Sequence, residues 1–180
     1  MLIERDRSCL LVVDVQERLA PAMADAATVI RNAAVLMQAA ARLGVPILVS
    51  EQYPQGLGRT VSELRSLAQD SAFFSKIDFS CADDPALSER IGKTDREQVV
   101  ICGIEAHVCV LQSALGLQRQ ERECFVVADA VSSRAPVSRD TALQRLGDNG
   151  VELVTTEMVV FEWLGKAGTP EFKELSRLIR

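Results

Sequence analysis

The feature of this sequence that most constrains its fold is a regular alternation of short apolar runs with longer stretches of helical periodicity. The run 8–14 (SCLLVVD) precedes residues 26–43, where apolar side chains recur every three or four positions up to Gly44. Short apolar runs predict strands buried on both faces, and their alternation with helices predicts βαβ units around a parallel sheet. We therefore predict a three-layer α/β/α sandwich, Rossmann-like, with a mostly parallel sheet of about six strands.

The remaining elements follow the same rhythm. Further strands are expected at 45–50, in the first part of 73–79, at 98–102, 123–128 and 151–155. Further helices are expected at 85–92 with Asp84 as cap, at 105–120, 137–147, from a Thr156 cap to 164, and from Pro170 toward 179. The Pro and two Gly of 51–58 (EQYPQGLG) predict a loop at a strand end, where the ligand crevices of such folds form.

Composition restricts the class of protein. A chain of 180 residues with 48% hydrophobic residues fits one domain, 1–180. The net charge is −5 and no basic cluster would follow a phosphate backbone, so nucleic acid is not an expected partner. The sequence shows neither an apolar run of roughly 20 residues nor a signal-peptide pattern at its start, so no membrane partner is expected and we predict a cytoplasmic location.

The five cysteines suggest reduced thiols. Cys9, Cys102 and Cys124 lie within apolar runs, which is typical of buried packing residues in a reducing compartment. The sequence has no CxxC pair, and a single histidine, His107, leaves little from which to build a metal site.

Three polar residues at strand ends are candidates for chemistry. Asp14 is the last residue of the first apolar run, a position that by itself favours a turn or capping role over a catalytic one. Lys76 lies among phenylalanines, where it either extends along the rim toward water or is buried beside a carboxylate. Cys109 lies beyond the strand 98–102 and near a helix start, where free N–H groups and the helix dipole favour a thiolate; the alternative is a small packing residue.

His107 is a poor base for Cys109. Two residues apart on one α-helix, the side chains point about 200° away from each other. We expect a rim residue or a substrate contact instead.

Five segments in order resemble the isochorismatase-like cysteine hydrolase family, and the small isochorismatase-domain hydrolases within it. They are 10–16 (LLVVDVQ), 51–58 (EQYPQGLG), 74–80 (FSKIDFS), 103–110 (GIEAHVCV) and 126–134 (VVADAVSSR). The resemblance implies a catalytic triad of Asp14, Lys76 and Cys109. It also implies a cis peptide bond between Ile104 and Glu105, and an oxyanion hole made of the N–H groups of Glu105 and Cys109.

The activity that this resemblance implies is hydrolysis of a small amide, carbamoyl or similar C–N bond through an acyl-thioester on Cys109, without a cofactor. Nicotinamidases of the family use a metal held by several histidines, which this chain lacks. Isochorismate-cleaving members usually lack the cysteine. By the resemblance, the residues expected around a small, partly apolar substrate are Gln16, Gln52, Tyr53, Leu57, Phe74, Phe79 and His107.

Two other classes remain possible from the sequence. One is a non-catalytic protein that keeps the fold for binding a small molecule or for assembly, which slow labelling of Cys109 near neutral pH would favour. The other is a redox-active thiol protein, which would need the fold to bring Cys81 near Cys109. By analogy with the family we expect a homo-oligomer, a dimer or larger, for which Trp163 and Phe172 look like exposed apolar contacts.

Overall fold

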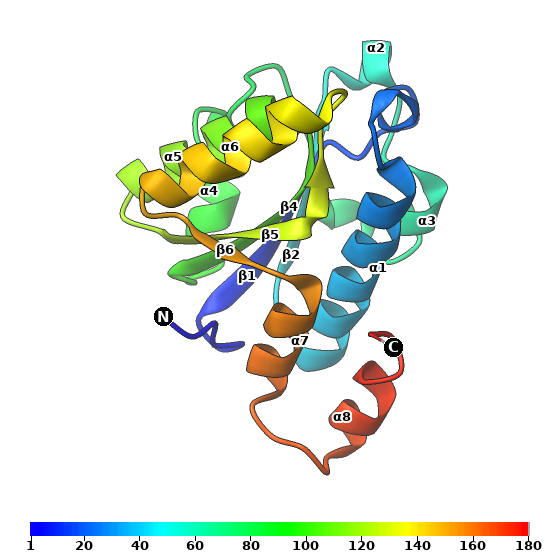
Figure 1. Cartoon of the computed structure of the whole chain (residues 1–180), viewed down its shortest axis with the longest axis vertical. Helices are drawn as coiled ribbons and strands as arrows, with labels where there is room; N and C mark the ends of the chain where they lie inside the picture. Colours follow the sequence, from blue (N-terminus) through cyan, green and yellow to red (C-terminus); the bar gives the residue numbers. More distant parts are fainter. Residues whose placement is uncertain (180) are drawn as a thin grey trace.

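The computed structural model describes residues 1–179, which form a parallel sheet between two layers of helices (Figure 1). This confirms the predicted three-layer α/β/α architecture. The strands of the six-stranded sheet are β1 (Ser8–Val13), β2 (Ile47–Gln52), β3 (Phe73–Lys76), β4 (Gln98–Ile104), β5 (Glu123–Ser132) and β6 (Glu152–Val154). The α-helices described are α1 (Ala26–Leu43), α2 (Pro54–Leu57), α3 (Ser62–Arg65), α4 (Pro85–Gly92), α5 (Leu111–Arg119), α6 (Pro136–Asp148), α7 (Thr156–Leu164) and α8 (Pro170–Leu175).

The strand order reverses in the middle of the sheet, between β1 and β4. The order is β3-β2-β1-β4-β5-β6, and neighbouring strands are parallel. The chain therefore moves outward from β1 in one direction, returns to pair β4 with β1, and moves outward in the other direction. In open parallel sheets the ligand crevice lies at this reversal, beyond the carboxyl ends of the strands.

Two apolar cores hold the layers together. On one face α1, α7 and α8 cover side chains such as Leu10 and Val12 of β1, and on the other face α4, α5 and α6 cover Leu11 and Val13 (Figure 1). Successive residues of a strand point to opposite faces, so a continuously apolar β1 serves both cores. This explains why the sequence shows runs rather than alternation at the central strands.

Helix α1 shows how local signals fix an element. The Asp25 side chain accepts a hydrogen bond from the Thr28 N–H, and Gly44 ends the helix in the left-handed conformation at φ +74°. Both are standard end signals, and the helix has the predicted bounds. Asp84 caps α4 as predicted by accepting from the Leu87 N–H.

Several elements differ from the sequence prediction. Thr155, not Thr156, caps α7 by accepting from the Met158 N–H, and α8 ends at Leu175 rather than near 179. Strand β5 continues to Ser132, because a shift of register opposite Ile101 to Gly103 accommodates extra residues. Such a bulge depends on the neighbouring strand and leaves little local signal.

Trp163 was expected to be exposed, and this prediction is wrong. Its side chain is 1% exposed in the core beneath α7, and its Nε1–H donates to the Ser8 Oγ at 2.8 Å. The indole N–H finds a buried acceptor, which makes full burial of a large ring favourable. Phe172 is half-buried and packs against Phe161.

Gly103, near the end of β4, is required by close packing against β1. Its φ is +120°, and a Cβ there would overlap the Val13 carbonyl oxygen. We expect Gly103→Ala to lower the free energy of unfolding by about 3 kcal/mol or more, because backbone cannot move aside as a flexible side chain can. The matched control is Gly44→Ala, where φ is also positive but no atom lies within 4 Å, so the cost should be about 1–2 kcal/mol. Urea unfolding of both variants checks the difference, and equal costs would contradict it.

No helix within residues 1–179 has the length and apolarity that a membrane span requires.

Candidate active site

The three candidate catalytic side chains lie together at the reversal of the sheet. Asp14 follows β1, Lys76 is the last residue of β3, and Cys109 lies in the π-helical turn Ala106–Val110 that follows β4. Because β1 and β4 are neighbours and β3 is two strands from β1, their carboxyl ends bring these residues to one edge of the sheet. Short π-helical turns often occur at functional sites.

Asp14 is fully buried and has strong hydrogen-bond donors on both carboxylate oxygens. The Ser50 Oγ–H donates to Oδ1 at 2.7 Å, and the Lys76 ammonium donates to Oδ2 at 2.8 Å. The backbone of Asp14 has φ +51°, a conformation that is unusual outside glycine and is common at active sites. The position is therefore a built site for a carboxylate rather than an ordinary turn.

Lys76 is enclosed rather than extended toward water. Its side chain is 0% exposed, and beyond Asp14 its ammonium donates to the Gln52 Oε1 at 2.6 Å. The carbonyl oxygens of Asp78 and Phe79, each at 3.2 Å, complete its surroundings. Burial lowers the pKa of Lys76, but the charge of Asp14, followed by the thiols of Cys81 and Cys109, outweighs burial and leaves that pKa above its ordinary value. Lys76 therefore stays protonated at neutral pH.

Cys109 lies against Asp14 as a protonated thiol. It is buried, and burial together with the charge and hydrogen bond of Asp14 raises the pKa of Cys109, while Lys76 opposes the rise. The sequence prediction that the helix start would favour a thiolate is therefore wrong for the resting site, because loss of hydration outweighs the dipole. The thiol can still react if Asp14 removes its proton during the reaction.

The other cysteines are free and buried. Cys9, Cys102 and Cys124 pack inside the cores, which confirms their predicted packing role. Cys81 lies beside the site, where its charge would interact with Asp14, Lys76 and Cys109.

The buried thiols predict a loss of stability in alkali. Burial raises the pKa of Cys9 to about 11 and that of Cys102 to about 12, from the ordinary 9.0. A group whose pKa is higher in the folded state stabilises the fold fully below pH 9, and this contribution is lost as the pH rises toward the folded value. Between about pH 8 and about pH 10 we expect each buried thiol to cost roughly 1 kcal/mol of unfolding free energy. Urea titrations of wild type and Cys102→Ala check this: the variant should lose less stability over that interval, and equal losses would contradict it.

The turn after β4 has an open backbone donor. The Ile104–Glu105 peptide bond is cis, as expected from the family resemblance. The Val108 and Val110 N–H groups both donate to the Glu105 carbonyl, and the Glu105 N–H has no acceptor among residues 1–179. The Glu105 carboxylate is mostly buried and pairs with Arg134 at 2.9 Å.

The two glutamines expected in the pocket support the site from behind. Gln16 is fully buried; its Nε2 donates to the carbonyl oxygens of Gln52 and Gly58, and its Oε1 accepts from the Gln52 N–H. Gln52 links the Lys76 ammonium to the Ile77 carbonyl through its two amide groups. These contacts hold the loop after β2 and the Lys76 ammonium in place.

The other expected pocket residues differ in exposure. Tyr53 and Phe79, next to the glutamine and lysine contacts, are about half exposed, and Leu57 and Phe74 are half-buried. His107 is half-buried, and its Nδ1 lies 2.9 Å from the Ser133 Oγ, so it has a fixed partner other than Cys109. Among the described residues, sequence reasoning missed Ser50 and Ser133. The only signal for either was a polar residue at the end of an apolar run.

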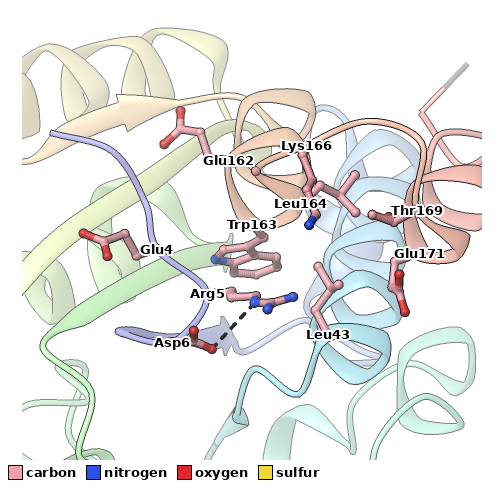
Figure 2. A pocket seen from close by; sticks show the side chains of 11 residues that line it. Glu4, Arg5, Asp6, Leu43, Glu162, Trp163, Leu164, Lys166, Thr169 and Glu171 are labelled. Carbon is pink, nitrogen blue, oxygen red and sulfur yellow. Dashed lines mark ion pairs between the residues drawn. The ribbon is translucent and has the colours of Figure 1, made fainter.

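A cavity of about 650 Å³ lies elsewhere (Figure 2). Its lining includes Arg5 and Asp6, which precede β1, Trp163 in the last turn of α7, and Lys166, which follows that helix. It therefore opens at the amino end of β1, away from the Asp14 side. The candidate catalytic groups lie at the carboxyl end of the sheet, so this cavity is separate from the candidate site. No cluster of possible metal ligands is found in residues 1–179.

Comparison with known proteins identifies the class. The isochorismatase domain matches residues 8–158, so the chain belongs to this family of hydrolases. It is 41% identical over 172 residues to "isochorismatase domain-containing protein 2" of Danio rerio, covering 96% of this chain and 86% of that protein. A structure described as MAR1 ribonuclease from Caenorhabditis elegans has a TM-score of 0.93 at 36% identity, covering 99% of this chain and 92% of that one. An Escherichia coli structure described as an octameric hydrolase of unknown specificity has the same fold, with a TM-score of 0.91 at 22% identity, covering 99% and 90%.

Proposed function

We propose that this protein is a metal-independent cysteine hydrolase that cleaves a small amide or carbamoyl-type C–N bond through an acyl-thioester on Cys109. The observation that carries the proposal is the buried ion pair of Asp14 and Lys76, at 2.8 Å, beside the buried thiol of Cys109, whose pKa both charges affect. A thiol beside a buried carboxylate has a base to accept its proton, and the nearby ammonium is a positive charge that stabilises the sulfur anion formed in the reaction.

The first half of the reaction forms the acyl-enzyme. Asp14 takes the Cys109 proton as the sulfur attacks the substrate carbonyl carbon, and the carbonyl π electrons move onto oxygen. The Glu105 and Cys109 N–H groups donate to this oxyanion; the partnerless Glu105 N–H supports that role. The C–N bond then breaks, and the amine leaves with the proton held by Asp14.

The second half restores the thiol. Asp14 takes a proton from water as the water oxygen attacks the thioester carbonyl, and the C–S bond breaks when the second oxyanion collapses. The sulfur regains the proton from Asp14. Lys76 keeps its protons throughout because four acceptors surround its three N–H groups, and it acts as a fixed charge. These steps require neither metal nor cofactor.

The rim favours a small, partly apolar substrate. Tyr53 and Phe79 present half-exposed rings, whereas the charges of Asp14 and Lys76 neutralise each other inside the site. An uncharged amide would enter without leaving a buried charge unpaired.

Association into a homo-oligomer is part of the proposal. The octameric E. coli protein of the same fold supports it, as do the exposed side chains of Ile77 and Phe79. Cytoplasmic location also stays a prediction, supported by five free cysteines.

A non-catalytic binding protein is the alternative from another class. Burying an ion pair costs free energy of folding, and a protein that only binds a ligand does not require such a pair beside a thiol. Slow labelling of Cys109 no longer favours this alternative, because a protonated resting thiol is expected in the enzyme as well.

A substrate screen tests the proposed function. Small amides, imides and carbamoyl compounds are incubated with wild type and Cys109→Ala, and released ammonia is measured. An RNA oligonucleotide is included because the C. elegans relative is described as a ribonuclease. We expect ammonia release by wild type alone and no RNA cleavage. RNA cleavage without ammonia release from any compound would overturn the proposal.

A further inference from the structure

Ser50, the fourth residue of β2, donates a hydrogen bond to the Asp14 carboxylate. The proposed reaction gives this serine no role. Its side chain is fully buried, and its Oγ lies 2.7 Å from the Asp14 Oδ1. The Ser50 backbone carbonyl also accepts the Asp14 N–H at 3.1 Å. Ser50 therefore holds both the backbone and the carboxylate of Asp14.

The direction of this hydrogen bond is fixed by chemistry. An ionised carboxylate only accepts, and a serine has one hydroxyl proton, so that proton belongs to the contact with Asp14. The thiol of Cys81 is near the hydroxyl groups of both Ser50 and Ser113, each of which lowers its pKa against the larger effect of burial. Ser113 in turn accepts the Cys81 N–H at 2.8 Å. Ser50, Cys81 and Ser113 form a buried polar wall behind Asp14.

We propose that Ser50 is a positioning residue that fixes the rotation of the Asp14 carboxylate, so that its other oxygen faces the groups that take part in proton transfer. This inference rests on the proposed function. With Ser50 on Oδ1 and Lys76 on Oδ2, the plane of the carboxylate is held at two points. Without the Ser50 hydroxyl, only the Lys76 contact holds the plane of the carboxylate, and the buried Oδ1 has lost its hydrogen-bond donor.

Ser113 provides a matched control within the same wall. It is a fully buried serine whose hydroxyl oxygen binds a backbone N–H rather than the carboxylate. Ser113→Ala should therefore cost stability, as any loss of a buried hydrogen bond does, and leave proton transfer unchanged. A purely structural Ser50 would behave in the same way as Ser113.

The kinetic test uses a compound that wild type hydrolyses. We expect Ser50→Ala to lower kcat about tenfold with KM changed less than about twofold, because a hydrogen bond to a charged group is lost in every step that uses Asp14. Ser50→Thr, which keeps the hydroxyl, should restore both quantities, and Ser113→Ala should stay within about twofold of wild type in both.

A second readout needs no substrate. Alkylation of Cys109 by iodoacetamide, mapped by peptide mass spectrometry, should slow about tenfold in Ser50→Ala, because the Asp14 carboxylate that accepts the thiol proton is no longer held in place. Ser113→Ala should label at the wild-type rate, and urea midpoints verify that each variant is folded. If Ser50→Ala matches Ser113→Ala in labelling and kinetics, the positioning role is overturned. Turnover by Cys109→Ala would instead overturn the proposed function. The positioning role of Ser50 would then be judged by the labelling rates of Ser50→Ala and Ser113→Ala alone.

Discussion

Replacing Cys109 with alanine is expected to lower turnover at least about a thousandfold while the protein stays folded. The loss follows because no other thiol can replace the nucleophile. Cys81 lies behind Asp14 and is fully buried, and Cys102 lies within β4. The structural cost should be about 1 kcal/mol, because only a small, nearly buried side chain is shortened. Ammonia release and the urea midpoint measure the two effects separately.

Cys102→Ala is the matched control for this change. It also removes a buried thiol, and it does so in the core beneath α1 rather than at the crevice. Its activity should remain within about threefold of wild type, since it alters packing only. Full activity of Cys109→Ala on the same compound would contradict the thioester route.

Replacing Lys76 with methionine is expected to lower the free energy of unfolding by about 3–5 kcal/mol and to abolish turnover. Methionine keeps much of the length of the side chain, so the volume changes little. The ammonium is lost, however, and Asp14 becomes a buried charge with Ser50 as its remaining strong donor. The amide oxygen of Gln52 loses its partner as well. Urea unfolding near neutral pH measures the cost.

The double variant Asp14→Asn, Lys76→Met separates charge from packing. With both charges removed, most of the lost stability should return, because a neutral pair carries no unbalanced desolvation cost. The double variant should still lack activity, because it has no base for Cys109. If Lys76→Met alone is as stable as wild type, the Lys76–Asp14 pair does not support the fold as described.

Local signals were sufficient for much of the fold. The Asp25 cap and the Gly44 end of helix α1 are residues directly next to the helix in sequence. The continuous apolar run of β1 indicates burial on both faces. The positions of Asp14 and Lys76 at strand ends then follow from the parallel topology. These features depend on a few neighbouring residues, which is why the sequence alone predicts them.

Features that depend on distant neighbours were not predictable from the sequence. The extension of β5 to Ser132 requires a register shift against β4, and the burial of Trp163 requires the hydroxyl of Ser8. The role of Ser50 requires the fold to bring β2 beside β1. In each case the deciding contact joins residues far apart in the chain, so no local pattern reports it.

The protonation state of Cys109 was likewise not predictable from the sequence. Its place near a helix start suggests a thiolate. In the structure, burial and the negative charge of Asp14 instead raise the pKa of the thiol. The degree of burial is a property of the packed site. The proposed reaction therefore gives Asp14 the role of base during the attack, because the resting thiol is protonated.

The measurement that tests this account most directly is the mass of the Cys109 peptide during turnover. Wild type is mixed with a hydrolysed amide, quenched in acid within one turnover, digested and analysed by mass spectrometry. The account predicts that the peptide containing Cys109 carries the acyl group of the substrate, and that Cys109→Ala carries none. Turnover that proceeds with Cys109 unmodified at every quench time, and that persists in Cys109→Ala, would contradict it.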